Sequence, residues 1–144
     1  MAQAIKQAIL AKENGEIPVG AVLVDVSTGN IVASAGNQTI SNNDPTAHAE
    51  INVIRARCQE LSTQRIPDHD LYVTLEPCPM CASAISNARI RKVIFGAYDP
   101  KSGGVEHGPK IYTHDTCHHS PEIIGGVMEE TCAKLLKDFF EDRR

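Results

Sequence analysis

Long apolar runs are missing from this chain. Runs such as Val19 to Val24 are far too short to cross a bilayer, which requires about 20 apolar residues. The first residues, Met1 to Leu10, also lack a basic segment followed by an apolar stretch and a small-residue cleavage site. We therefore expect a cytoplasmic protein without membrane association.

Positive charge is also scarce. The 14 Lys and Arg residues are outnumbered by 18 Asp and Glu residues, which gives a formal net charge of -4. Taken alone, this balance argues against a nucleic-acid partner, because phosphate binding requires a basic surface. Basic residues nevertheless predominate between residues 89 and 110, and the chain ends in Arg143-Arg144. A local basic face and scattered, solvated charges both fit this distribution.

An even, disulfide-forming set of cysteines is lacking as well. The five cysteines are an odd number in a chain without a secretion signal, so a disulfide scaffold is not expected. Cys58 and Cys132 fall in helical patterns and are predicted to be small buried hydrophobic residues. Internal repeats, linkers and low-complexity tracts are absent too. With 42% hydrophobic and 22% charged residues, we expect residues 1–144 to form a single globular domain.

Hydrophobic periodicity predicts an alternation of helices and strands. Helical spacing indicates helices over residues 2–13, 79–87 and 128–140, and another that begins at Pro45 behind the capping residue Asp44. Strands are predicted over residues 19–26, 31–35, 71–75, 92–95 and 123–124, and the first two form a hairpin. Residues 99–121 show no period and are expected to be irregular. This order predicts an α/β fold with three α/β/α layers and a mixed five-stranded sheet.

Two short motifs hold the residues best suited to chemistry: His48-Ala49-Glu50 and Pro77-Cys78-Pro79-Met80-Cys81. The spacing of Cys78 and Cys81 places both sulfurs on one face of a helix. The neighbouring prolines indicate the first turn of that helix, where free amides and the helix dipole favour a thiolate. A C-x-x-C pair alone is also typical of a redox pair or of two core cysteines. The distant H-x-E motif favours a metal site.

One imidazole and two thiolates are three of the four ligands that zinc takes, which leaves the fourth position for a catalytic water. We predict that His48, Cys78 and Cys81 bind one Zn²⁺ ion. Glu50 is not needed as a ligand and is predicted to be the catalytic acid and base. His48 and Glu50 can share one site only if their helix points its start at the metal, so two helix N-termini should converge there. H-x-E…P-C-x-x-C is the signature of zinc nucleobase deaminases.

Other polar residues give weaker signals. Asn37 follows the second predicted strand and is a candidate to contact a base or a sugar, although a plain turn asparagine looks the same in sequence. Asp99 is a candidate ligand contact, with the capping of a turn as the default. Residues 18–20, Pro-Val-Gly, form either a close backbone approach or a strand entrance.

The C-terminal third contains two further groups. His114, Cys117, His118 and His119 could form a second metal cluster, but their spacing is not that of a structural zinc site, so we interpret them as part of a polar loop. Phe139-Phe140 is expected to be the core and the fringe of the last helix.

Several blocks of this sequence resemble one known family. They are Ile17–Val22, Asn37, Asp44–Ile51, Leu71–Cys81, Phe95–Gly103, and Asp138–Phe140 with the terminal arginines. In these blocks the chain resembles the cytidine deaminase superfamily, and within it the bacterial tRNA-specific adenosine deaminases. The first blocks are shared with guanine deaminases and yeast-type cytosine deaminases, so they indicate only the superfamily. The last two blocks favour the tRNA enzymes.

The resemblance implies a cytidine deaminase-like fold and a specific reaction. This reaction is zinc-dependent hydrolysis of the wobble adenosine to inosine in the anticodon of an arginine tRNA, by a homodimer with one zinc per subunit. It also implies that Asn37 contacts the target nucleotide and that Asp99 and Phe140 lie near the anticodon loop. Residues 105–120 depart from the family pattern, so the resemblance does not extend to RNA contacts in this stretch.

Three other functions are considered. A deaminase of guanine or another free nucleobase would have the same Asp44–Glu50 block. A catalytically inactive RNA-binding partner would not need Glu50. A redox or purely structural zinc protein would leave both Glu50 and an open zinc position without a purpose.

Overall fold

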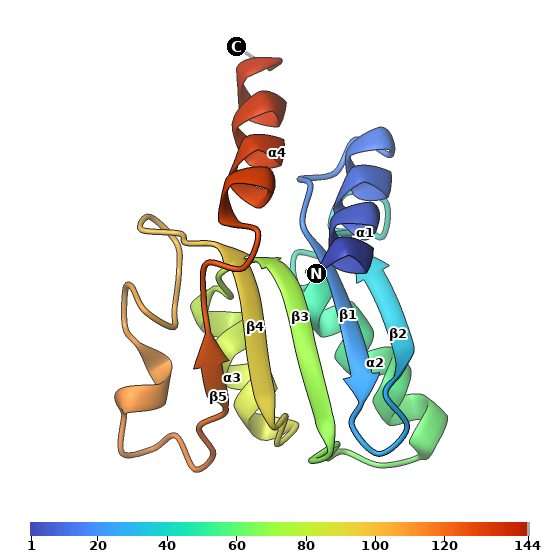
Figure 1. Cartoon of the computed structure of the whole chain (residues 1–144), viewed down its shortest axis with the longest axis vertical. Coiled ribbons are helices and arrows are strands. Elements are labelled where there is room, and N and C mark those ends of the chain that lie inside the picture. The colour runs from blue at the N-terminus through green and yellow to red at the C-terminus, as the bar shows by residue number, and fades with distance from the viewer. Residues whose placement is uncertain (144) are drawn as a thin grey trace.

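The computed structural model describes residues 1–143, and Arg144, the second terminal arginine, lies outside the described residues. Helices and strands alternate along the chain (Figure 1). In order they are α1 (Ala2–Glu13), β1 (Gly20–Asp25), β2 (Asn30–Gly36), α2 (Ala49–Leu61), β3 (His69–Leu75), α3 (Pro79–Asn87), β4 (Lys92–Ala97), the 3₁₀ helix η1 (Ile111–Thr113), β5 (Glu122–Ile124) and α4 (Glu129–Glu141).

The strands form one mixed sheet in the order β2-β1-β3-β4-β5. β1 pairs antiparallel with both β2 and β3, whereas β3, β4 and β5 run parallel to one another. The parallel strands are connected through α3 and through the long 98–121 segment, as parallel connections require. The carboxyl ends of β3 and β4 therefore meet at one edge of the sheet, where the Pro77–Cys81 motif follows β3 and the segment with Asp99 follows β4.

Helices cover both faces of the sheet (Figure 1). α1 and α4 contact each other and lie on one face, while α2 and α3 contact each other and lie on the other. A Cβ on Gly20 would collide with the Ala4 carbonyl of α1, and a Cβ on Gly96 would collide with Cys132 of α4. The glycines thus let both helices approach the sheet closely. The structure confirms the three-layer α/β/α fold. Both alternatives for residues 18–20 apply, because Gly20 opens β1 and also approaches the backbone of α1 closely.

The hydrophobic core lies mainly between the sheet and the α2–α3 layer. Its largest fully buried apolar side chains come from the central strands and the elements beside them: Phe95, Leu23, Ile66, Leu71, Ile85 and Ile90. Burial of each such side chain stabilises the fold by about 1.5–3 kcal/mol. Residues of β3 and β4 are buried on both faces, as expected for interior strands covered by helices. This core holds the carboxyl edge of the sheet in place beneath the motifs.

Most predicted boundaries are confirmed, but the start of α2 is wrong. The Asp44 carboxylate accepts hydrogen bonds from the backbone and hydroxyl of Thr46, at 2.8 and 2.7 Å, and so caps a turn rather than a helix. α2 begins four residues after Pro45, at Ala49. Cys132 is buried as predicted, whereas Cys58 is only half-buried. Among residues 1–143, no helix has both the length and the apolar composition needed to cross a membrane.

Candidate active site

His48 stands at the start of α2. It is the N-cap residue, with an extended backbone (φ -71°, ψ 154°). A distant side chain fixes this start, because the Asn37 side-chain oxygen accepts a hydrogen bond of 2.9 Å from the amide of Ala49. One of the free amides at the helix N-terminus is thereby satisfied. The position of His48 thus depends on the loop after β2.

Cys78 occupies the equivalent position on α3. It is the N-cap residue, with Pro79 following at the first helical position. Proline suits that position because its missing N–H would have no partner there. Cys81 lies one turn further on and is fully buried. The two helix starts converge as predicted from the sequence.

The three predicted ligand residues have the geometry of a zinc site. The Nδ1 atom of His48 lies 3.7 Å from the Cys78 sulfur and 3.5 Å from the Cys81 sulfur. All three ligand atoms lie within 4.8 Å of one another. In a tetrahedral site with Zn–S about 2.3 Å and Zn–N about 2.0 Å, a sulfur and a nitrogen are about 3.5 Å apart. The residues therefore fit one zinc ion.

The pKa values of the two cysteines are shifted in opposite directions. A hydrogen bond from the Cys81 thiol, with help from His48, lowers the pKa of Cys78 to about 4. The same interaction with Cys78, together with burial, raises the pKa of Cys81. The Cys78 sulfur is therefore a thiolate at neutral pH. Thiolate is the form that binds zinc.

Glu50 lies beside this group without being part of it. Its side chain is buried, at 4% exposure, and it lines the same cavity as His48 and Cys78. Burial raises the pKa of Glu50, and the nearby charge of Cys78 adds to the increase. A raised pKa brings a carboxyl group closer to the working pH, which favours general acid–base catalysis.

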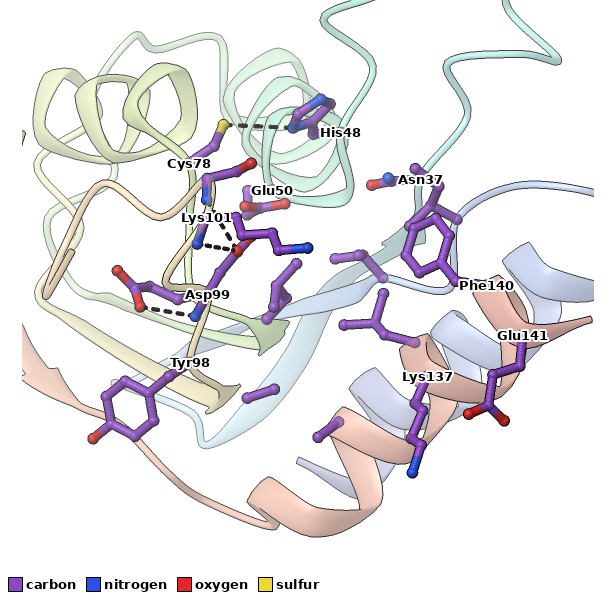
Figure 2. Close-up of a pocket in the computed structure, with 18 of the residues that line it drawn as sticks. Asn37, His48, Glu50, Cys78, Tyr98, Asp99, Lys101, Lys137, Phe140 and Glu141 are labelled. Atoms are coloured by element: carbon purple, nitrogen blue, oxygen red, sulfur yellow. Dashed lines mark hydrogen bonds between the residues drawn. The ribbon is translucent and has the colours of Figure 1, made fainter. Parts of the chain in front are cut away.

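A cavity of about 990 Å³ opens above these residues. This is at the upper end of ordinary ligand pockets, which measure about 300–1,000 Å³. Figure 2 shows His48, Cys78 and Glu50 on one side of the cavity, and Lys137, Phe140 and Glu141 on the side formed by α4. The cavity thus extends from the metal-ligand group to the C-terminal helix.

The weaker candidates Asn37, Asp99 and Phe140 all line this cavity. Asn37 also holds the start of α2, and the Asp99 carboxylate also accepts hydrogen bonds from the backbone of Lys101 and Ser102. Phe140 is 49% exposed, whereas Phe139 next to it is buried. The interpretation of this pair as fringe and core is confirmed, with the fringe residue facing the cavity.

Residues 114–119 do not assemble a second metal group. The side chains of His114 and His119 hydrogen bond to the carbonyls of Pro109 and Ile90, each at 2.6 Å. Cys117 contacts the hydroxyl of Ser86. Within residues 1–143, His48, Cys78 and Cys81 form the only metal-ligand group of this kind. The interpretation of residues 114–119 as a polar loop is consistent with these contacts.

Sequence reasoning did not single out Glu76, which also lines the cavity. Its carboxylate has no exposure to solvent and contacts the ring of His107 at 2.8 Å. Burial alone would raise the pKa of Glu76, but hydrogen bonds from His107 and from backbone amides lower it below the ordinary value. The available signal was a charged residue placed directly between a buried strand and the Pro77-Cys78 turn.

Residues 1–97 match the cytidine and deoxycytidylate deaminase zinc-binding region, which includes all three ligand residues. The chain belongs to the cytidine and deoxycytidylate deaminase family. Zinc is therefore the metal that this ligand group binds in the family. The assignment to the superfamily from the sequence is confirmed.

The similarity to known proteins extends over the full chain. A tRNA-specific adenosine deaminase from Agrobacterium fabrum is 50% identical over 144 residues, which are 100% of this chain and 93% of the relative. A solved structure from work on A-to-I editing by tRNA:A34 deaminases at the wobble position has a TM-score of 0.92 and 51% identity, covering 94% of this chain and 97% of its own. A guanine deaminase structure from Bacillus subtilis is 40% identical with a TM-score of 0.64, but covers 67% of this chain and 61% of its own.

Proposed function

We propose that the protein hydrolyses the wobble adenosine of a tRNA anticodon to inosine and ammonia. One observation carries the choice of a tRNA over a free base. The 50% identity to a tRNA-specific adenosine deaminase covers the whole chain, including α4, which forms the side of the cavity away from the metal ligands. The similarity to the guanine deaminase structure is confined to about two thirds of each chain.

The proposed reaction assigns a role to each residue at the base of the cavity. His48, Cys78 and Cys81 hold zinc, which supplies a water molecule activated for attack at neutral pH. Glu50 accepts a proton from this water and transfers it to the ring nitrogen beside C6 of adenine. The water oxygen adds to C6, which forms a C–O bond and makes this carbon tetrahedral. Glu50 then takes the proton of the new hydroxyl group and delivers it to the amino nitrogen, so that the C–N bond breaks, ammonia leaves and the C6 carbonyl of inosine forms.

We further propose that Asn37, Asp99 and Phe140 contact the substrate. A base in an RNA loop must leave its stack to reach a buried catalytic group, and aromatic side chains provide a surface for such bases. Phe140 is a half-exposed aromatic residue on the outer side of the cavity. Lys101, which also lines the cavity, adds positive charge for the phosphates. A local basic contribution of this kind is compatible with a net charge of -4.

An arginine tRNA and a homodimer complete the proposal. Both follow from the family resemblance rather than from a contact within the chain. A second subunit would place its own basic residues on the same RNA-facing surface, and only that one face needs to be basic while each chain stays acidic overall. Sedimentation of the zinc-loaded protein should give twice the chain mass of 15.6 kDa.

The deciding experiment compares two substrates. Purified zinc-loaded protein is incubated with an arginine-tRNA anticodon stem-loop that contains the wobble adenosine and, separately, with free guanine, and ammonia is measured. We expect ammonia from the stem-loop alone. Turnover of guanine with an inert stem-loop would instead establish the free-base function.

A stem-loop with inosine already at the wobble position serves as the matched substrate control. It has the same fold and charge but no amino group at the reacting carbon, so no ammonia should form. Ammonia from this control would show that deamination occurs at another nucleotide.

A further inference from the structure

Glu76 is a buried carboxylate between the end of β3 and the start of α3. It follows Leu75, the last residue of β3, and is separated from the N-cap Cys78 only by Pro77. Its side chain is fully buried, at 0% exposure. A buried carboxylate is costly unless several donors compensate for its charge. The donors that satisfy Glu76 therefore indicate what it holds.

Five N–H groups point at this carboxylate, and all come from residues 99–107. The amide of Asp99 donates to Oε1 at 3.1 Å, and the ring of His107 contacts the same oxygen at 2.8 Å. The amides of Val105, Glu106 and His107 donate to Oε2 at 3.2, 3.0 and 3.1 Å. Successive amides that converge on one oxygen form an anion-binding backbone arrangement. The loop is thus folded around the charge of Glu76.

The same loop lies against the turn that presents Cys78. The amide of Gly104 donates to the carbonyl of Pro77 at 2.8 Å. A Cβ on Gly104 would fall 2.6 Å from the backbone nitrogen of Pro79, and one on Gly103 would collide with the carboxylate of Glu76. These contacts leave no room between the loop and the metal-ligand turn. A displacement of the loop would therefore be transmitted to both sides of the cavity.

The first residues of the loop are also part of the cavity. Asp99, Lys101 and Ser102 line it, and Figure 2 shows Asp99 and Lys101 on the side next to Glu50. Hydrogen bonds to the Asp99 side chain order Lys101 and Ser102, but the amide of Asp99 is itself held by Glu76. The position of this side of the cavity consequently depends on Glu76.

We propose that Glu76 is a positioning residue, which holds residues 99–107 against the Cys78 turn and so sets the cavity for the reaction. This inference rests on the proposed function for the reaction that it serves. Glu76→Gln is the decisive substitution because it keeps the shape of the side chain while replacing one acceptor oxygen with an NH₂ group. That NH₂ group would face N–H donors and could not accept from them.

The experiment compares Glu76→Gln with Glu106→Gln in the zinc-loaded protein. Glu106 is an exposed residue of the same loop whose amide, not its side chain, reaches Glu76. Zinc content, amide hydrogen exchange of residues 99–107, and kcat and KM on the anticodon stem-loop are measured for each protein. We expect Glu76→Gln to lower kcat/KM about 10–100-fold, the range for groups that support metal ligands. Exchange should accelerate in residues 99–107 and not in β1 or α1, and Glu106→Gln should match the wild type.

Two results would overturn the proposal. One is a Glu76→Gln protein with wild-type exchange and kinetics. The other is an increase in exchange spread evenly over the chain, which would assign Glu76 to general stability. If Glu76→Gln does not fold, His107→Ala removes one of the five donors and should show a smaller change confined to the same loop. A wild-type protein inactive on the stem-loop would refute the proposed function, whereas the exchange measurement would still decide whether Glu76 holds the loop.

Discussion

Two buried glutamates line the cavity, Glu50 at its base and Glu76 next to the side formed by residues 99–107. Their surroundings shift the two pKa values in opposite directions. Burial raises the pKa of Glu50, and the charge of Cys78 adds to that effect. Burial would also raise the pKa of Glu76, but the His107 ring and the loop amides lower it. Both residues are at most 4% exposed. Burial alone therefore does not set the direction of the pKa shift of a carboxylate. The hydrogen-bond donors directed at the carboxylate also contribute.

The difference matches the two proposed roles. A group that transfers a proton needs a pKa near the working pH, so it cannot be saturated with donors that stabilise its charged form. A group that holds a loop through its charge needs to stay ionised. At Glu76, five N–H donors stabilise the ionised form. The comparison therefore separates a proposed catalytic carboxylate from a proposed positioning one within the same cavity.

Removal of zinc gives the largest expected effect and tests whether the two regions are independent. A strong chelator should abolish ammonia release, because no activated water remains for Glu50 to deprotonate. Hydrogen exchange of residues 105–107 should stay slow, because the anion that holds these amides is Glu76 and not the metal site. Activity should return when zinc is added. Turnover by protein shown to contain no zinc would contradict the assignment of the ligand group.

Glu50→Gln is expected to have the next largest effect. The amide cannot transfer protons, so kcat should fall about 10²–10⁴-fold, the usual contribution of general acid–base catalysis. Zinc content should remain one ion per chain, because Glu50 lies outside the metal-ligand group. Glu60→Gln, on the same helix and at an exposed position, is the matched control. Loss of zinc from Glu50→Gln would show that Glu50 is a ligand.

Glu16→Gln should have the smallest effect. It tests, away from the metal site, whether hydrogen-bond donors lower the pKa of a buried carboxylate. The Glu16 carboxylate is buried and accepts hydrogen bonds from the amides of Ile40 and Ser41 at 3.1 and 2.8 Å. Burial would raise the pKa of Glu16, but these bonds lower it below its ordinary value of 4.5. The variant should lose about 1.5–3 kcal/mol of unfolding free energy at pH 7, the scale of hydrogen bonds to a charged group.

The pH dependence gives the sign of this effect. A lowered pKa stabilises the folded protein above the unfolded-state pKa, and that contribution is lost as the pH falls through the folded-state pKa. The stability difference between wild type and Glu16→Gln should therefore shrink below about pH 4.5. Urea unfolding from pH 7 to pH 3 measures it, with the exposed Glu13→Gln as the control. A stability difference that stays constant from pH 7 to pH 3 would show that these hydrogen bonds do not lower the pKa of Glu16.

Local sequence signals predicted much of the fold and the chemical part of the site. The spacing of Cys78 and Cys81 with Pro79 between them predicted the start of α3, because all of these interactions lie within one helical turn. The start of α2 was placed too early at Pro45. Its real start receives a hydrogen bond from Asn37, twelve residues before Ala49, and no local pattern reveals a partner at that distance.

By itself, the sequence determined the ligand types and the alternation of helices and strands and indicated the proposed proton-transfer group, because these depend on side-chain chemistry and on short-range periodicity. Only the tertiary structure decided how the site is assembled. It brought two helix starts together, set α4 across the cavity from Glu50, and directed five donors from residues 99–107 at Glu76. The contacting pairs of the metal-ligand group and of Glu76 lie 23 to 33 positions apart in the sequence, and they form only when the packed sheet holds its carboxyl edge in place.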